Sequence, residues 1–74
     1  MSYELWDLDT GNATGVYPSL IAALQVVEAA VRRDGEPTLE GLALLERRSG
    51  GDRRLIAQER DLLPMIGVGT STAR

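Results

Sequence analysis

Alternation of apolar and polar residues in two separate stretches constrains this chain of 74 residues more than any other feature. The stretches cover residues 3–17 and 42–58, and each is interrupted by a turn that contains glycine. A period of two is typical of strands, and a short glycine turn between two such runs is typical of a β-hairpin. Between the stretches, residues 20–33 place apolar side chains at helical spacing. This order predicts a hairpin, a helix and a second hairpin.

The predicted helix has clear signals at both ends. Ser19 is a good N-cap residue, and Gly35 suits the position just after the helix, where a left-handed backbone is common. An apolar stripe runs along the helix and is formed by Leu20, Leu24, Val27 and Val31. Ile21 and Val26 lie farther round, so the apolar arc is wider than one small sheet needs. This excess predicts an interface on the helix.

In the first hairpin we expect strands at residues 3–8 and 13–17, joined by a turn at residues 9–12. If Leu8 pairs with Ala13, Trp6 lies across from Gly15, and its ring can cover the bare glycine backbone. Apolar side chains then lie on both faces of the hairpin. One face can meet the helix, and the other needs a different cover.

In the second hairpin we expect strands at residues 42–47 and 53–58 around a two-residue turn at Gly50 and Gly51. That register places Arg48 opposite Arg53 and Arg47 opposite Arg54. It also puts Leu42, Leu44, Leu55 and Ala57 on one face of the sheet. The arginines opposite one another predict a local repulsion that a bound anion would relieve.

Together these elements predict an α+β fold of two layers. The order is ββαββ, with a four-stranded antiparallel sheet, one main helix on one face of it, and a short C-terminal helix over residues 60–66. We expect a single domain at residues 1–66 and a flexible tail at residues 67–74.

The composition excludes most catalytic chemistry. The chain has no histidine, cysteine or lysine, so it cannot build an imidazole base, a thiol nucleophile or a Schiff base, and it has no phosphate-binding glycine loop. We therefore predict a protein that is not an enzyme, with no cofactor and no metal. The remaining exception is carboxylate-based or metal-assisted chemistry at Asp7, Asp9 or Glu59.

The segment at residues 7–12 begins like a calcium-binding loop, with Asp7 and Asp9 two positions apart. The match then fails, because Gly11 stands where an oxygen donor is needed and Asn12 stands where glycine is needed. Asp9 and Asn12 are better explained as turn formers, since short polar side chains hydrogen-bond to nearby backbone.

The chain is small enough that one core barely offsets the loss of conformational entropy on folding. Disulfides and zinc sites are excluded, so oligomerisation is the remaining means of added stability. Our main hypothesis is a non-enzymatic protein-interaction module that forms a homodimer, through the helix or through the outer sheet face. The candidate interface residues are Trp6, Ile21 and Val26.

All eight cationic residues are arginines, and half of them lie in the second hairpin of a chain with net charge −3. These four are Arg47, Arg48, Arg53 and Arg54. Their guanidinium groups suit phosphate oxygens, so the alternative hypothesis is a small regulator that binds nucleic acid or another polyanion. The competing interpretation is a solvated hairpin tip that discourages edge-to-edge pairing.

The start of the chain lacks a signal-peptide pattern, and no apolar run approaches the roughly 20 residues that cross a bilayer. We therefore expect a cytoplasmic protein that does not enter a membrane. The use of arginine without lysine, in a chain rich in alanine and glycine, points to a GC-rich bacterial genome.

The first hairpin carries the run Tyr-Glu-Leu-Trp-Asp at residues 3–7, followed by Thr-Gly-Asn at residues 10–12. The pattern also includes Gly15, Tyr17, the run Leu-Ala-Leu at residues 42–44 and the pair Ile-Ala at residues 56–57. It resembles a group of small uncharacterised bacterial proteins. The resemblance covers residues 3–63. It implies the limits of the fold and no known activity.

Overall fold

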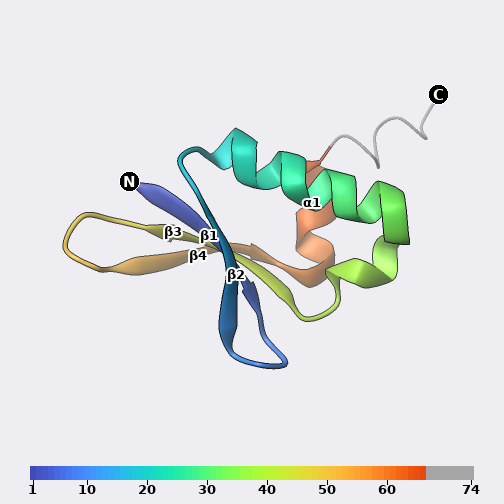
Figure 1. Ribbon diagram of the computed structural model, residues 1–74, viewed down its shortest axis with the longest axis horizontal. Helices are drawn as coiled ribbons and strands as arrows, with labels where there is room; N and C mark the ends of the chain where they lie inside the picture. The colour runs from blue at the N-terminus through green and yellow to red at the C-terminus, as the bar shows by residue number, and fades with distance from the viewer. Residues whose placement is uncertain (67–74) are drawn as a thin grey trace.

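The computed structural model describes residues 1–66 of the chain. Two β-hairpins and the helix between them follow one another as the sequence predicts (Figure 1). In chain order the elements are β1 (Ser2–Asp7), β2 (Asn12–Tyr17), α1 (Leu20–Asp34), η1 (Glu36–Leu39), β3 (Leu42–Arg47), β4 (Arg53–Gln58) and η2 (Glu59–Met65). The expected tail at residues 67–74 lies outside the described residues.

The four strands form one antiparallel sheet in the order β2-β1-β3-β4. The first strand of the chain is therefore central, and β2 and β4 are the two edges. Ser2 lies opposite Arg47, and Asp7 lies opposite Leu42. The β1–β2 turn and the β3–β4 turn consequently lie at opposite ends of the sheet, and Figure 1 shows them pointing in different directions. The predicted α+β class is confirmed.

Helix α1 begins and ends where its capping residues predict. The Ser19 hydroxyl accepts a hydrogen bond of 3.1 Å from the Ala22 backbone N–H. Gly35 has φ of 89°, and its N–H donates to the Val31 carbonyl at 2.7 Å. A positive φ costs glycine little, so the chain can turn sharply here. The helix is one residue longer than predicted.

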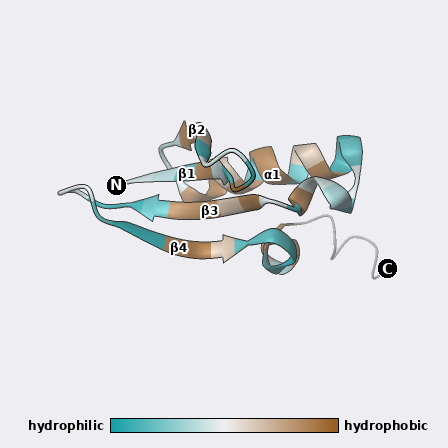
Figure 2. Cartoon of the chain, turned by 90° about the horizontal axis from the view of Figure 1, so that it is seen from below, coloured by the Kyte–Doolittle hydropathy of each residue, from teal (hydrophilic) through white to brown (hydrophobic). Residues whose placement is uncertain are grey.

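The core lies between the sheet and α1, and the two 3-10 segments close one end of it. Helix α1 packs against β1 and β2, while η2 packs against β4 and η1. The largest fully buried side chains are Val27, Leu39, Leu44 and Leu62. Figure 2 shows that β3 and β4 are apolar in their middle parts and hydrophilic toward the hairpin tip. The predicted C-terminal helix, at residues 60–66, is the 3-10 helix η2 at Glu59–Met65, and Pro64 lies inside it.

The first hairpin turns at residues 8–11, one residue earlier than predicted, and β2 then carries a bulge, so the predicted register is wrong. Leu5 lies opposite Gly15 and Trp6 lies opposite Ala13, which leaves Thr14 as the extra residue. The Thr14 hydroxyl donates a 3.2 Å hydrogen bond to the Leu5 carbonyl oxygen. This bond stabilises the bulge by giving a partner to a carbonyl near the break in the ladder.

Gly15 is a packing position, as predicted, but the aromatic side chain that covers it is not that of Trp6. The ring of Tyr17, two residues along the same strand, lies over Gly15 and occupies the space that a Cβ atom would need. A side chain at position 15 would therefore displace this ring. The sheet places Trp6 on the other face, away from α1.

The second hairpin has a longer loop than the predicted two-residue turn. The Arg48 N–H donates to the Asp52 carbonyl at 2.8 Å, and the Gly51 N–H donates to the Arg48 carbonyl at 3.0 Å. Gly50 and Gly51 both have positive φ, which a loop of this shape requires. As a result Arg47 lies opposite Arg53, not opposite Arg54.

A second bulge, in β4, moves Leu55 to the face opposite the predicted one. Leu44 pairs with Ala57 and Leu45 pairs with Leu55, so Ile56 is the extra residue. Residues directly opposite one another share a face, so Leu55 lies beside Leu45 and away from Leu44. A slip of one residue reverses the face of every side chain beyond it.

Candidate functional site

The sheet has α1 on one side, and we call its other side the outer face. Leu5 and Leu44 belong to the core beneath α1, so the residues that alternate with them point away from it. Ala43 is buried but does not belong to the core cluster, in agreement with this assignment. The strand register gives the members of the outer face as Ser2, Glu4, Trp6, Ala13, Val16, Ala43, Leu45, Arg47, Arg53, Leu55 and Gln58.

The centre of the outer face holds a buried carboxylate. Glu4 is only 2% exposed. Its Oε1 accepts a 2.8 Å hydrogen bond from the Trp6 indole N–H and a 2.9 Å hydrogen bond from Nε of Arg53. Oε2 lies 3.8 Å from a guanidinium nitrogen of Arg47. Side chains of the sheet itself therefore cover this carboxylate.

Arg53 also stacks near Trp6, with its guanidinium carbon 5.7 Å from the centre of the indole ring. A cation at this distance is attracted to the ring face. Trp6, Glu4 and Arg53 thus contact one another pairwise and form a compact unit on the outer face. Each member holds the other two in place.

The hydrogen bond from Trp6 lowers the pKa of Glu4, burial opposes this shift, and Arg53 and Arg47 lower the pKa further. Only a single layer of side chains covers the carboxylate, so desolvation raises its pKa less than the hydrogen-bond donors and the nearby cations lower it. Glu4 is therefore ionised at neutral pH. Its negative charge lies between Arg47 and Arg53, where the opposed guanidinium groups would otherwise repel each other.

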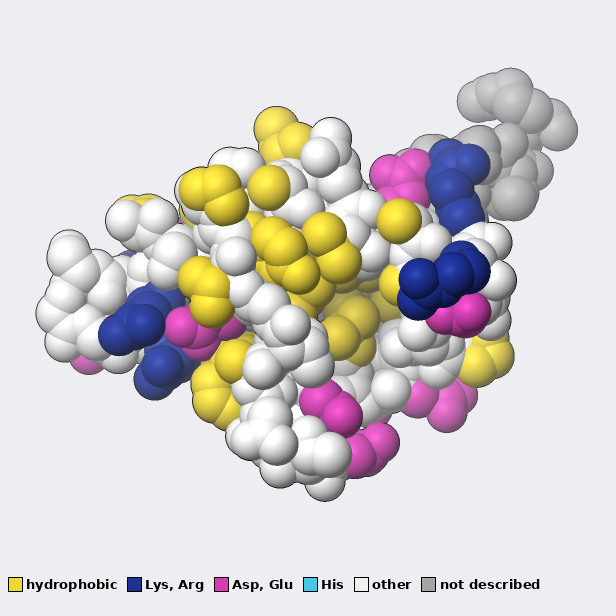
Figure 3. Space-filling model, in the orientation of Figure 1, with side chains coloured by type: hydrophobic (Ala, Val, Ile, Leu, Met, Phe, Trp, Pro, Cys, Tyr) yellow, Lys and Arg dark blue, Asp and Glu magenta, His cyan; other side chains and the backbone are white. Residues whose placement is uncertain are grey.

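A second buried carboxylate, Glu46, lies on the face of the sheet toward α1. A guanidinium nitrogen of Arg54 lies 3.2 Å from it, and Nε of Arg48 lies 3.4 Å from it. All four arginines of the second hairpin are therefore paired with a buried glutamate. In Figure 3 the arginine side chains at the β3–β4 end lie beside acidic side chains, and hydrophobic side chains gather over the middle of the molecule.

Neither glutamate was predicted as part of a site. Each lies at a buried position of a strand in which apolar and polar residues alternate. Burial of a carboxylate is unusual unless it is paired. For Glu4 the available signal was Trp6, two residues later and on the same face, with an N–H donor that needs a partner when covered. For Glu46 the signal was its alternation with Leu44, which places it on the buried face.

One row across the four strands of the outer face contains three aliphatic side chains and the Glu4 carboxylate. The row consists of Val16, Glu4, Leu45 and Leu55, each opposite the next. Val16 is 59% exposed and Leu55 is 50% exposed, while Leu45 between them is partly buried. Trp6 and Ala43 lie in the adjacent row. The outer face thus exposes aliphatic side chains on its two edge strands, with the covered Glu4 carboxylate and the partly buried Leu45 between them.

The structure does not bring the three predicted interface residues together. Trp6 lies on the outer face, whereas Ile21 and Val26 lie on α1, where they are 69% and 41% exposed. Five positions on an α-helix correspond to a rotation of about 140°, so Ile21 and Val26 point in different directions. They are two separate exposed side chains.

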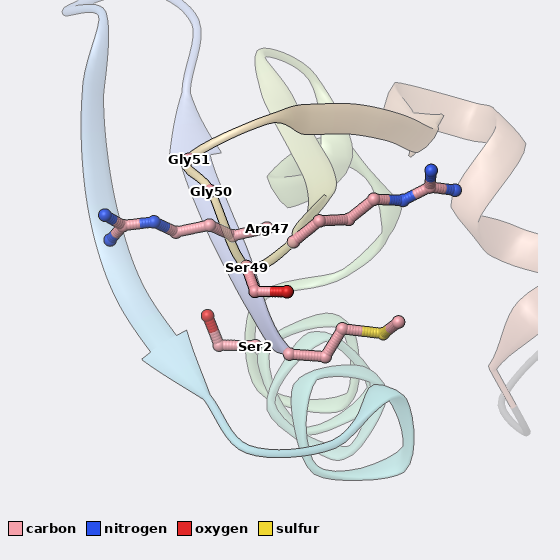
Figure 4. A pocket seen from close by; sticks show the side chains of 7 residues that line it. Ser2, Arg47, Ser49, Gly50 and Gly51 are labelled. Atoms are coloured by element: carbon pink, nitrogen blue, oxygen red, sulfur yellow. The ribbon is translucent and has the colours of Figure 1, made fainter.

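The tip of the second hairpin has a shallow hollow of about 320 Å³. Its lining consists of Met1, Ser2, Arg47, Arg48, Ser49, Gly50 and Gly51. In Figure 4 the Arg47 side chain extends to one side of this hollow, and the Ser49 hydroxyl points to the other. The arginine and the hydroxyl do not converge on one point, so the hollow is not a built anion site.

Two of the three carboxylates that were candidates for chemistry, Asp7 and Glu59, accept hydrogen bonds from the backbone. Oδ1 of Asp7 accepts a 2.9 Å hydrogen bond from the Asp9 N–H, which forms the first turn. Oε2 of Glu59 accepts a 3.1 Å hydrogen bond from the Gly41 N–H, across two segments. Within residues 1–66 the acidic residues form no group of three or more that could hold a metal ion.

No protein-family model matches the chain, and searches of curated proteins and of solved structures likewise give no significant match. The resemblance of the first hairpin to small bacterial proteins therefore stays a prediction. Among the described helices, none is long and apolar enough to cross a membrane.

Proposed function

We propose that the protein is a non-enzymatic interaction module that forms a homodimer through the outer face of its sheet. The observation that carries this proposal is the row across that face, in which the apolar side chains of Val16 and Leu55 are at least half exposed. Exposed apolar side chains that gather on one face of a small domain mark an interaction site more often than a scattered set of apolar residues does.

Burial of this surface would supply stability that a chain of this size needs. Each large aliphatic side chain moved from water into an interface contributes roughly 1.5–3 kcal/mol. The stability of a small domain is only a few kcal/mol. Val16 and Leu55 are about half exposed and Leu45 is already partly buried, so each contributes only a part of this amount. Summed over two copies, the gain is comparable with the stability of one copy.

The helix is the less suitable interface. Ile21 and Val26 point in different directions, and single exposed apolar residues of this kind are ordinary on protein surfaces. The outer face also contains Trp6, the type of residue that most often dominates binding energy at interfaces. Its partly exposed ring borders the apolar row.

Sedimentation velocity over a wide range of protein concentration tests the proposal. We expect a reversible dimer, and we expect Leu55→Glu to remove it because the substitution places a charge in the interface. Ile21→Glu is the matched control, since it replaces a comparably exposed aliphatic residue on α1. A chain that stays monomeric at all concentrations, or a dimer lost in the Ile21→Glu variant alone, would contradict the proposal. Far-UV circular dichroism checks that both variants fold.

The polyanion hypothesis has one observation in its favour. Four guanidinium groups share two buried carboxylates, so the hairpin tip keeps an excess of positive charge. Against it, each of these groups already has an internal partner. The test is fluorescence anisotropy with labelled single-stranded RNA and duplex DNA at several salt concentrations.

For this test Arg47→Ser and Arg48→Ser are the suitable variants, because their ion pairs are the two longest of the four, at 3.8 Å and 3.4 Å. Binding that weakens steeply with salt and is lost in the double variant would support the hypothesis. Binding that is absent or insensitive to salt would remove it.

A further inference from the structure

The charges of this protein are divided along the direction of its strands. One end of the sheet carries the four arginines of the second hairpin. The other end carries acidic side chains of the connecting segments: Glu40, Glu59 and Asp61 lie there together with the single cation Arg60, and the Asp9 carboxylate lies near Gly41. The strand register fixes this division, because Arg47 lies opposite Ser2 at one end and Leu42 lies opposite Asp7 at the other.

The acidic end is continuous with the outer face. A second hollow, of about 290 Å³, lies there and is lined by Glu40, Gln58, Glu59, Arg60 and Asp61. Gln58 pairs with Ala43 and so belongs to the outer face itself. From Leu42 to Arg47 the strand spans roughly 17 Å, which is the approximate distance between the two charged ends.

When two copies pack outer face to outer face, the two-fold axis lies between the sheets, and its direction decides which ends of the two sheets meet; two directions are the limiting cases. If the axis runs along the strands, the arginines of one copy lie over the arginines of the other. If the axis runs across the strands, the arginines of one copy lie over the acidic end of the other. Complementary potentials favour correct partners, and like charges brought together cost several kcal/mol.

We propose that the occupant of the outer face is a second copy of this chain whose strands run antiparallel to those of the first, with Arg47 of each copy near Glu40 of the other. The proposal rests on the homodimer proposed above and adds its geometry. The apolar row lies near the middle of the face and meets its own counterpart, and each charged end meets the opposite charge.

Edge-to-edge pairing is the competing way for two sheets to associate. Strand β4 is an edge, but it carries a bulge at Ile56 and begins with Arg53 and Arg54. Bulges and charged residues are the devices that protect an edge from pairing with another strand. These features favour the face over the edge as the site of contact.

The area of the outer face limits the expected affinity of the dimer. A sheet of four strands and about six residues a strand covers roughly 19 by 20 Å, so two such faces bury on the order of 800 Å² in total. This area lies below the roughly 1,200–2,000 Å² of specific, stable interfaces and in the range of weak, transient ones. We therefore expect a dimer that dissociates on dilution, and the experiment must be done where the dimer is populated.

The chain has no cysteine, so single cysteines placed by mutation can be cross-linked without interference. The experiment uses full-length Arg47→Cys and Glu40→Cys proteins with a short bismaleimide, alone and mixed. The antiparallel dimer predicts a cross-link in the mixture and little in either protein alone. A cross-link in Arg47→Cys alone would overturn the proposed orientation and leave the homodimer standing.

Two further variants separate the orientation from the homodimer itself. Leu45→Cys lies near the centre of the face and should cross-link to itself in either orientation, whereas Ile21→Cys on α1 should not. If Leu45→Cys does not cross-link, or if Ile21→Cys does, the outer-face homodimer fails as well. If Leu45→Cys cross-links and the mixture of Arg47→Cys and Glu40→Cys does not, only the orientation fails.

Charge reversal gives an independent measurement. Arg47→Glu and Glu40→Arg should each weaken the dimer about fivefold or more, since each change creates two unfavourable contacts in a symmetric interface. The double variant Arg47→Glu/Glu40→Arg should recover most of the loss. Loss in the double variant equal to the sum of the two single losses would contradict the proposal.

Discussion

The indole N–H of Trp6 donates a hydrogen bond of 2.8 Å to the carboxylate of Glu4, two residues earlier on the same strand. Residues two apart on a strand share a face, so the tryptophan can cover the carboxylate and satisfy it at the same time. This contact allows a nearly fully buried negative charge to lie on the side of the sheet that α1 does not cover.

The Trp6→Phe variant tests the indole donor. Phenylalanine keeps an apolar ring over Glu4 but removes the hydrogen bond, so a buried carboxylate loses one partner. We expect the free energy of unfolding to fall by about 1–3 kcal/mol. The measurement is urea unfolding followed by far-UV circular dichroism, at a concentration where the chain is monomeric.

The control for this variant is a double-mutant cycle with Glu4→Gln. The cost of Trp6→Phe should be smaller when position 4 is neutral, because an amide is less costly to leave without a partner. Equal costs in both backgrounds would show that the two side chains do not interact energetically.

The ionisation of Glu4 predicts a dependence of stability on pH. Hydrogen bonding to Trp6, together with Arg53, lowers the pKa of Glu4 in the folded state relative to the unfolded chain. The resulting stability is fully present above the unfolded pKa of about 4.3 and is lost as the pH falls toward the folded pKa. The free energy of unfolding should therefore decrease below about pH 5.

Glu4→Gln isolates this contribution. At pH 7 the variant should be less stable than the parent chain, and the difference should narrow as the pH falls from 5 to 3. Chemical denaturation at a series of pH values measures both proteins. A difference that stays constant over this range would show that Glu4 does not carry the predicted linkage.

Arg53 should matter more for stability than an exposed arginine of the same chain. Its Nε donates to Glu4 at 2.9 Å, and its guanidinium group lies near the Trp6 ring. Arg53→Gln leaves Glu4 without its closest cation, so we expect a loss of about 1–3 kcal/mol. Urea unfolding at pH 7 gives the value.

Arg33→Gln is the matched control, since the Arg33 side chain is 76% exposed and pairs only with its neighbour Asp34 among the described residues. Exposed pairs of this kind contribute well under 1 kcal/mol, so this variant should be nearly neutral. If the two glutamine variants have equal stability, the buried pair with Glu4 is not the stabilising contact that its geometry indicates.

The sequence predicts the elements of this fold well and the pairing of its strands less well. Ser19 and Gly35 mark the ends of α1 because capping depends on local backbone geometry alone. Strands β3 and β4 have the predicted limits because alternation and glycine turns are local signals too. The bulges at Thr14 and Ile56 depend on contacts with neighbouring strands. A local stretch of sequence carries no information about such contacts.

The same distinction applies to the site. The basic character of the second hairpin could be predicted from composition, but its partners could not. Glu4 is 49 residues from Arg53, so their contact depends on β1 lying beside β3 and on the register of β4. The shift of Leu55 to the outer face has the same origin, and without that shift the apolar row would not extend to the fourth strand.

The contact between Gly15 and Tyr17 gives the last prediction. An added Cβ at position 15 would occupy the space of the Tyr17 ring, so Gly15→Ala must move the ring off the strand. We expect a loss of roughly 1–3 kcal/mol, as for other substitutions that overfill a packed position. The near-UV circular dichroism band of tyrosine should change at the same time.

The control is the same substitution in a Tyr17→Ala background. There Gly15→Ala should cost little, because the alanine at position 17 leaves the space free and the alanine at position 15 suits a strand better than glycine. A cost for Gly15→Ala that is the same in both backgrounds would place its cause in the backbone and not in the aromatic ring.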